Sequence, residues 1–317
     1  MANTGKDINI AKHLLEQGSL VAIPTETVYG LAANALDVSA VSRIFEVKKR
    51  PYFDPLIVHI PNIDTAKRYA EFLPAAAIQL AKKFWPGPLT LVVKKDRIIP
   101  DLVTSGLDTV GLRCPDHPLT STLLHRLNFP LAAPSANPFG YVSPTRASHV
   151  QEQLGNEIPY ILDGGSCEVG IESTIVGFEN DLPVILRVGG LSHEMIESVV
   201  GKTAVMTHST SNPLAPGQLK SHYAPRVKVI IGNLEEMLQR YNVHHSGVLT
   251  FSRDFKSPYQ YILSPSGSLQ QAAQNLFSAL REFDKMPIDV ILAELVPDHG
   301  LGKAINDRLR RAAADGD

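Results

Sequence analysis

Residues 8–24 read INIAKHLLEQGSLVAIP, and the pattern of this stretch recurs along the first two thirds of the chain. Its apolar residues Ile8, Ala11 and Leu15 share one face of a helix, and Gly18 supplies the stop. A short apolar run over 20–23 follows and is closed by a proline, as expected for a buried strand. The same alternation continues to about residue 200, which predicts a mixed α/β domain.

Working outward from this stretch, short runs rich in β-forming residues predict strands over 89–93, 110–113, 130–133, 161–162, 174–178 and 184–188. Amphipathic segments predict helices over 39–49, 64–71, 75–85, 118–127, 145–154 and 192–200. The alternation breaks at 206–226, a segment with three prolines that predicts a linker.

Beyond the linker, the pattern predicts strands over 227–231, 247–251 and 288–295 and helices over 269–283 and 301–313. This order predicts a small, mostly parallel sheet covered by helices. We therefore divide the chain into a first domain at 5–205, the linker at 206–226 and a small second domain at 227–317.

The composition is that of an ordinary globular protein. Of 317 residues, 44% are hydrophobic and 20% charged, and 30 basic residues against 32 acidic ones leave a formal charge of −2. This balance excludes a bulk positive field that would draw the whole protein onto nucleic acid or membrane. Because no apolar run approaches the ~20 residues of a membrane span and no signal-peptide core is present, we predict a cytoplasmic protein. The two cysteines lie in no zinc-binding pattern, so no protein-bound metal is expected.

The common phosphate-binding loops and activated-nucleophile motifs are missing, which argues against a hydrolase built on a catalytic triad. Two basic residues suggest phosphate binding instead. Lys48 lies on the apolar face of the predicted helix 39–49, and Pro51 forces Arg50 out of helical geometry. Together they could clamp a phosphate chain, or they could simply complement the negative end of the helix dipole.

Polar residues also follow several predicted strands. Ser135 and Asn137 come directly after the strand at 130–133, Arg113 ends the strand at 110–113, and Ser173 precedes the one at 174–178. Loops at strand ends commonly carry binding groups, but each of these segments could equally be an ordinary surface turn.

Four segments taken together are more specific: PTETVYGL at 24–31, KKRP at 48–51, PLIVH at 55–59 and PSAN at 134–137. In order and spacing they resemble the YrdC-like family of threonylcarbamoyl-AMP synthases. The resemblance covers about residues 8–205, and SHYAP at 221–225 with the following α/β unit is similar to the longer, two-domain branch. It implies a twisted mixed sheet with a concave basic cavity and a small Rossmann-like second domain.

The resemblance also implies a reaction. L-Threonine, bicarbonate or carbon dioxide, and ATP with magnesium would give L-threonylcarbamoyladenylate and pyrophosphate, which makes the chain a nucleotidyltransferase. Partner proteins would then use the product to modify tRNA. The resemblance implies catalytic roles for Lys48 and Arg50, which also belong to the ATP set: Lys48, Arg50, Thr109, Ser135, Asn137, Ser143, Arg187 and Tyr223. It implies that threonine contacts Thr25, His59, Arg113 and Ser173.

Within the linker, Tyr223 would close over the site. Residues 52–54 are treated as variable and receive no role.

Two alternative functions belong to different classes of protein. One is a non-enzymatic RNA-binding protein, which would need no threonine pocket, and the other is another carbamoyl-transferring enzyme, whose longer chains usually carry zinc-finger-like cysteines. Direct contact of RNA with the basic cavity stays open, as do the oligomeric state, the order of substrate binding, the partner proteins and the role of the second domain.

Overall fold

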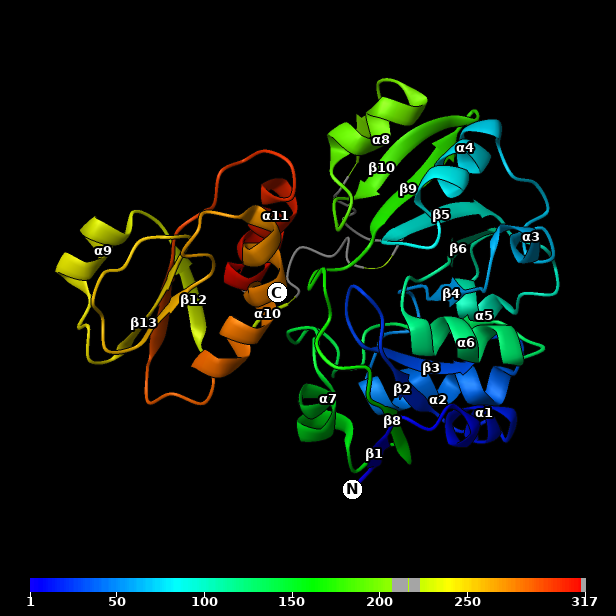
Figure 1. The fold of residues 1–317 in the computed structure, drawn as a ribbon, viewed down its shortest axis with the longest axis horizontal. Coiled ribbons are helices and arrows are strands. Elements are labelled where there is room, and N and C mark those ends of the chain that lie inside the picture. Colours follow the sequence, from blue (N-terminus) through cyan, green and yellow to red (C-terminus); the bar gives the residue numbers. More distant parts are fainter. Residues whose placement is uncertain (207–215, 217–222, 315–317) are drawn as a thin grey trace.

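The computed structural model describes residues 1–206, 216 and 223–314, which form two sheets with helices packed on them (Figure 1). The larger sheet is mixed, since β2 and β3 pair antiparallel whereas β5 and β9 pair parallel. Its strands lie in the order β1 (Asn3–Gly5), β8 (Tyr160–Leu162), β2 (Val21–Ile23), β3 (Gly30–Asn34), β7 (Leu131–Ala132), β4 (Ile57–His59), β6 (Thr109–Arg113), β5 (Leu89–Lys94), β9 (Thr174–Glu179), β10 (Leu182–Arg187) and β11 (Ala204–Val205).

The helices packed on this sheet are α1 (Ile8–Glu16), α2 (Val38–Lys48), α3 (Ile63–Ala66), α4 (Ala75–Phe84), α5 (Asp101–Thr104), α6 (Pro118–Arg126), α7 (Ala147–Leu154) and α8 (His193–Val200). Local chemistry explains their ends. Asp7 caps α1 by accepting a hydrogen bond from the amide of Asn9, and Asp37 caps α2 in the same way. Lys49, in the left-handed region with φ 52°, terminates α2 before Pro51.

The second sheet is entirely parallel among its described pairings, with the order β12 (Lys228–Ile231), β15 (Val290–Ala293), β13 (Ser246–Thr250) and β14 (Gln260–Ile262). Its helices are α9 (Leu234–Arg240), α10 (Leu269–Phe283) and α11 (Gly302–Ala313). These observations confirm the predicted fold class. No helix among the described residues is both long enough and apolar enough to cross a bilayer.

Some elements differ from the predictions. The helix predicted over 64–71 is wrong beyond Ala66, because the chain turns there and Ala70 forms a bridge to Lys95. The order predicted for the second sheet omits the seven-residue α9 and the half-buried strand β14. Strand β3 was missed because its sequence, GLAAN, has low β propensity and is nearly all buried, so it shows no alternation.

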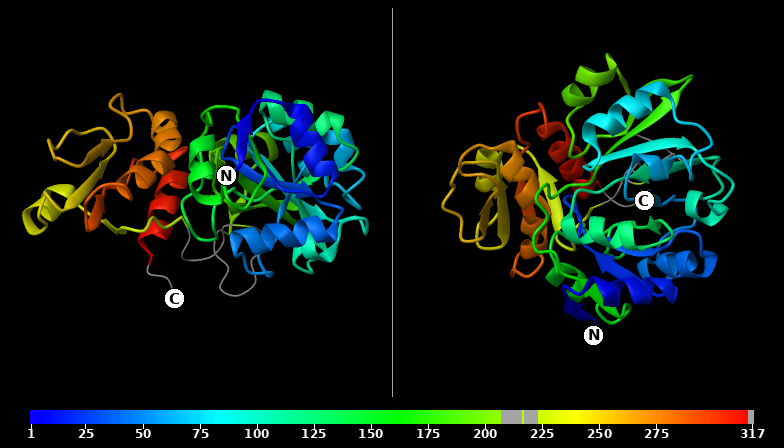
Figure 2. Two further views of the ribbon diagram at one scale, coloured as in Figure 1. Left: turned by 90° about the horizontal axis from the view of Figure 1, so that it is seen from below. Right: turned by 45° about the vertical axis from the view of Figure 1, so that its right-hand side comes forward.

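The two halves are packed directly against each other through α10 and α11, which lie between the two sheets (Figures 1 and 2). A single apolar cluster joins Val142 and Ile171 of the first half to Phe277 and Leu280 of α10. Gly170 allows this close approach, since a Cβ at this position would lie 2.4 Å from the backbone of Gln274. The second half is therefore part of the same packed structure as the first.

Candidate active site

Strand ends and loops of the larger sheet surround a small cavity of about 50 Å³ near the junction of the two halves. The residues lining it are Val28, Arg50, Ile57, His59, Arg113, Ala133, Pro134, Ser135, Glu172, Arg187, Pro216 and Tyr223. Half of these belong to the sets predicted to contact ATP and threonine. The lining contains three arginines and one carboxylate, so the cavity is suited to anions.

Lys48 lies beside the cavity without lining it. Helix α2 presents this residue on its apolar face, so the side chain is 1% exposed. Its amine donates hydrogen bonds to the carbonyl oxygens of Ser135 (2.6 Å) and Asn137 (2.5 Å). Burial, together with nearby Arg50, lowers the pKa of Lys48 well below its usual value. Lys48 therefore holds the loop that carries the predicted Ser-x-Asn pair.

Arg50 has a counter-ion in Asp54, within the segment that received no role from the sequence. The Arg50 Nη2 atom lies 2.9 Å from Asp54 Oδ2, and both side chains are nearly inaccessible to solvent. The guanidinium also donates to the carbonyl oxygens of Asp54 and Pro55. Burial raises the pKa of the Asp54 carboxyl, while Arg50 acts in the opposite direction. Asp54 thus holds Arg50 at the cavity wall.

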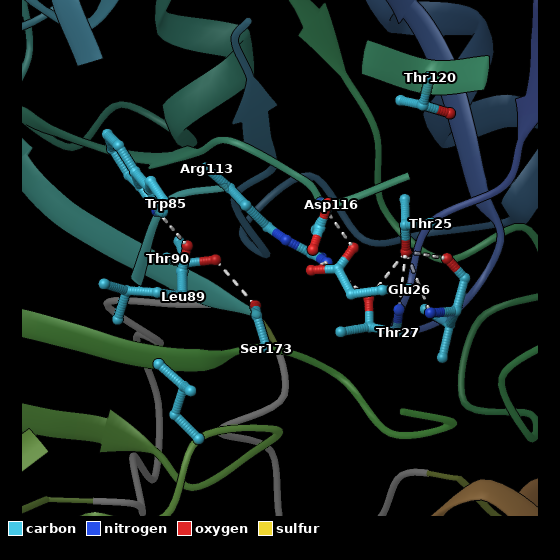
Figure 3. A network of polar contacts seen from close by, with 12 residues as sticks. Thr25, Glu26, Thr27, Trp85, Leu89, Thr90, Arg113, Asp116, Thr120 and Ser173 are labelled. Carbon is cyan, nitrogen blue, oxygen red and sulfur yellow. Dashed lines mark hydrogen bonds and ion pairs between the residues drawn. The ribbon is translucent and has the colours of Figure 1, made fainter. Parts of the chain in front are cut away.

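Two members of the threonine set, Thr25 and Arg113, belong to one polar network with Glu26 and Thr27, and Arg113 ends β6 (Figure 3). Arg113 Nη2 lies 2.8 Å from Glu26 Oε1 and donates to Thr27 Oγ1, also at 2.8 Å. Thr25 and Thr27 share a hydrogen bond of 2.8 Å. Glu26 is a further residue that the sequence did not single out, and it partly neutralises the guanidinium.

Ser173 forms a separate set of contacts: it bonds to Thr90 over 2.8 Å (Figure 3) and accepts from Arg187 over 3.1 Å. Arg187 also donates to the carbonyl oxygen of Pro216, the single described residue between 207 and 222. His59 lines the cavity, and burial followed by the charge of Arg113 lowers its pKa to about 3. His59 is therefore a neutral imidazole at physiological pH.

Tyr223 closes one side of the cavity. Its ring is 1% exposed and stacks on Phe277 of α10 with 5.6 Å between ring centroids. Burial raises the pKa of its phenol, so the hydroxyl stays protonated. The resemblance assigns Tyr223 to the site, and in the structure it lines this cavity, whereas Ser221 and His222 of the same motif lie outside the described residues.

Two members of the ATP set are buried just behind the lining. Ser143 donates to Glu172 Oε1 over 2.6 Å. Asn137 donates to the carbonyl oxygens of Pro138 and Tyr141. The structure does not bring Thr109 to the cavity: it begins β6, four residues before Arg113, and lines a separate pocket with Phe72 and Phe178.

Four residues of the site were missed by sequence reasoning: Glu26, Asp54, Glu172 and Arg308. Glu26 and Glu172 directly adjoin predicted residues, which is the only signal that could have indicated them. Arg308 belongs to α11, whose basic sequence reads as a solvated surface helix. The structure nevertheless buries it completely against the first half.

Two family models together match most of the chain. One, Sua5_yciO_yrdC, described as telomere recombination, matches residues 13–189, and the other, described as the C-terminal domain of threonylcarbamoyl-AMP synthase, matches residues 191–314.

Relatives of similar length agree with these matches. The threonylcarbamoyl-AMP synthase of Pyrococcus abyssi is 43% identical, covering 96% of this chain and 94% of that protein. The Bacillus subtilis protein of the same name is 41% identical, covering 96% and 92%. A crystal structure of P. abyssi Sua5 complexed with L-threonine matches with a TM-score of 0.92 at 41% identity, covering 99% of this chain and 97% of that one. The chain therefore belongs to the threonylcarbamoyl-AMP synthase family, in the two-domain form that includes the family's C-terminal domain.

Proposed function

We propose that this chain is a nucleotidyltransferase that makes L-threonylcarbamoyladenylate and pyrophosphate from L-threonine, bicarbonate or carbon dioxide, and ATP. The observation that carries the proposal is the convergence of Arg50, Arg113 and Arg187 on one buried cavity. The reactants are a carboxylate, a carbamate and a polyphosphate, all of which suit guanidinium groups. The names of its full-length relatives support the same reaction.

The chemistry needs positioning and charge more than proton transfer. The amine of threonine forms an N–C bond with carbon dioxide and releases a proton, which leaves a carbamate. A carbamate oxygen then bonds to the α-phosphorus of ATP while the bond from that phosphorus to the pyrophosphate oxygen breaks. Because His59 is neutral at physiological pH, the positive charge of the cavity comes from its arginines, which stabilise the charge that builds on the leaving group.

We assign ATP to the side of the cavity formed by the Lys-x-Arg and Ser-x-Asn segments. In this proposal Lys48 and Arg50 are catalytic, since they neutralise the triphosphate, and Ser135, Asn137, Ser143, Arg187 and Tyr223 complete the set. Lys48 donates a hydrogen bond to the carbonyl oxygen of Asn137, and this contact between the two segments supports a common role. The assignment of Thr109 rests on the family resemblance alone, since it lies at the other end of its strand.

We assign threonine to the network around Arg113. A guanidinium fork suits the planar carboxylate, and Thr25, His59 and Ser173 supply hydroxyl and imidazole groups for the rest of the substrate. Glu26 already contacts the fork at 2.8 Å, so a bound carboxylate would share the guanidinium with it.

Magnesium would enter as the complex with ATP. The carboxylates nearest the proposed triphosphate side, Asp54 and Glu172, are each paired with an arginine. Mg²⁺ commonly binds through substrate phosphates and water with few protein ligands, which is compatible with this donor set.

The product would be a mixed anhydride that water can hydrolyse, so proteins that modify tRNA must consume it promptly. We propose that the chain acts in the cytoplasm beside such partners. At about 50 Å³ the cavity must widen before it can admit ATP and threonine, and direct contact with RNA would need the same widening.

The decisive experiment incubates the purified chain with ATP, threonine and bicarbonate and measures pyrophosphate. Release that requires all three substrates, with the adenylate detected by mass spectrometry, supports the proposal. Pyrophosphate release that does not depend on threonine, or transfer of the carbamoyl group to another acceptor, indicates a different carbamoyl-transferring enzyme. RNA binding without any pyrophosphate release indicates the non-enzymatic alternative.

A further inference from the structure

Helix α11 of the second half places one arginine against the wall of the cavity. Arg308 is fully buried, and its Nε atom lies 3.1 Å from Glu172 Oε2. Its Nη1 atom donates to the carbonyl oxygen of Val188 over 2.7 Å. The centre of its guanidinium lies 5.3 Å from the centroid of the Tyr223 ring. The first two contacts cross from the second half of the chain to the first, and the third reaches the linker.

Each contact leads to a residue of the ATP set. Glu172 lines the cavity, and its other carboxylate oxygen accepts from Ser143 over 2.6 Å. Val188 directly follows Arg187, so its hydrogen bond holds the chain where Arg187 enters the cavity. The cation and the Tyr223 ring attract each other at the observed distance. The guanidinium of Arg308 therefore contacts Tyr223 directly, and it also contacts the residues that hold Ser143 and Arg187 in place.

Electrostatics gives the arrangement a functional consequence. Glu172 is 7% exposed and faces a cavity proposed to bind a polyphosphate. A buried carboxylate without a partner would repel that anion and would itself be strongly destabilised. Arg308 supplies the compensating charge, so the cavity keeps its net positive potential.

We propose that Arg308 is a positioning residue through which the C-terminal domain completes the ATP side of the active site. It neutralises Glu172 and holds Tyr223 and the chain next to Arg187 in place. This inference rests on the proposed function, because it assigns ATP to this side of the cavity. It also gives the second domain a role in the reaction itself.

The test compares four full-length proteins: wild type, Arg308→Met, Glu172→Gln and the double variant. Steady-state pyrophosphate release gives KM for ATP and for threonine, and equilibrium titration gives the Kd for ATP. We expect Arg308→Met to raise the KM and Kd for ATP at least tenfold while the KM for threonine changes less than threefold. Glu172→Gln keeps an acceptor for Ser143, so the double variant should recover most of the loss by removing the repelling charge.

Lys303→Met is the matched control. Lys303 is on the same helix and also forms a pair between the two halves, 2.7 Å from Glu194, but this pair is partly exposed and neither residue is among the described residues that line the cavity. It should leave both KM values unchanged. Thermal unfolding of every variant distinguishes loss of folding from loss of affinity for ATP. If Arg308→Met does not fold, the double variant, which leaves no unpaired charge, is compared with Glu172→Gln instead.

An Arg308→Met protein with normal KM and Kd for ATP overturns the inference, as does an equal loss for ATP and threonine that the second substitution does not reverse. If the wild-type chain binds ATP but does not make the adenylate, the proposed reaction is wrong. The Kd for ATP of the Arg308→Met protein still tests the role of Arg308 in that case. A wild-type chain that does not bind ATP overturns both.

Discussion

The amine of Lys48 donates a hydrogen bond to the carbonyl oxygen of Ser135 over 2.6 Å, although 87 residues separate them. This contact joins the Lys-x-Arg and Ser-x-Asn segments, which the sequence alone shows only as separate motifs. Because the amine is buried, its contacts with the loop are largely shielded from water, and loss of the amine leaves two carbonyl oxygens, one buried and one part-buried, without this donor.

Lys48→Met keeps the apolar part of the side chain and removes the charge and donors. We expect turnover to fall at least 100-fold, because the loop at 135–137 loses its anchor and the proposed triphosphate site loses a cation. Lys67→Met, an exposed residue paired with Asp64, is the control and should be unchanged. Pyrophosphate release and circular dichroism measure the two effects, and a folded variant with near-normal turnover would return Lys48 to a purely structural role.

Arg113→Lys keeps the charge but loses the planar fork. We expect the KM for threonine to rise at least tenfold, equivalent to about 1.4 kcal/mol, because one ammonium group cannot reach Glu26, Thr27 and a substrate carboxylate in the same geometry. Arg126→Lys on the exposed end of α6 is the matched control. An unchanged KM for threonine in the lysine variant would mean that a point charge is sufficient there.

Gly170→Ala tests the packing between the two halves. Gly170 has φ +76°, and the new Cβ would lie 2.4 Å from the backbone of Gln274 in α10. Gly165 has a similar φ of +84° with open space around it, so Gly165→Ala isolates the backbone strain, about 1–2 kcal/mol.

We expect Gly170→Ala to lower the free energy of unfolding in urea by at least about 2 kcal/mol more than Gly165→Ala does, since overpacking adds to the strain. It should also reduce pyrophosphate release, because Arg308 reaches the site only through this docked arrangement. Equal unfolding curves for the two variants would show that the interface tolerates separation at this point.

His59 predicts a pH dependence of stability. Burial lowers its folded-state pKa from 6.5 to about 3, so between these values the unfolded chain binds a proton that the folded chain does not. The contribution of neutral His59 to the free energy of unfolding is therefore fully present above pH 6.5 and is lost as the pH falls toward 3. From pH 7 to 5 the loss is about 2 kcal/mol.

His59→Gln should remove that share of the acid sensitivity, which urea unfolding at pH 7 and 5 would measure. His125, exposed on α6, is the control position, and His125→Gln should leave the difference between the two pH values as in wild type. The explanation is wrong if the wild type and His59→Gln lose the same free energy of unfolding between pH 7 and 5.

The sequence by itself determined most of the helices and strands of both sheets, because periodicity and end signals such as Gly18 after the first helix are properties of adjacent residues. It also indicated that Lys48 is buried, since the residue shares the apolar face of α2. The family resemblance pointed to six residues that the structure gathers around one cavity.

Only the tertiary structure decided which buried charged side chains form ion pairs with each other. Arg50 pairs with Asp54, Arg113 with Glu26, and Arg308 reaches Glu172 across 136 residues. It also placed Thr109 away from Arg113, although both lie on β6. The physical reason is that apolar patterning identifies the face of an element that leaves water, whereas a charge on that face needs a partner from another element, and the chain topology determines which partner lies within reach.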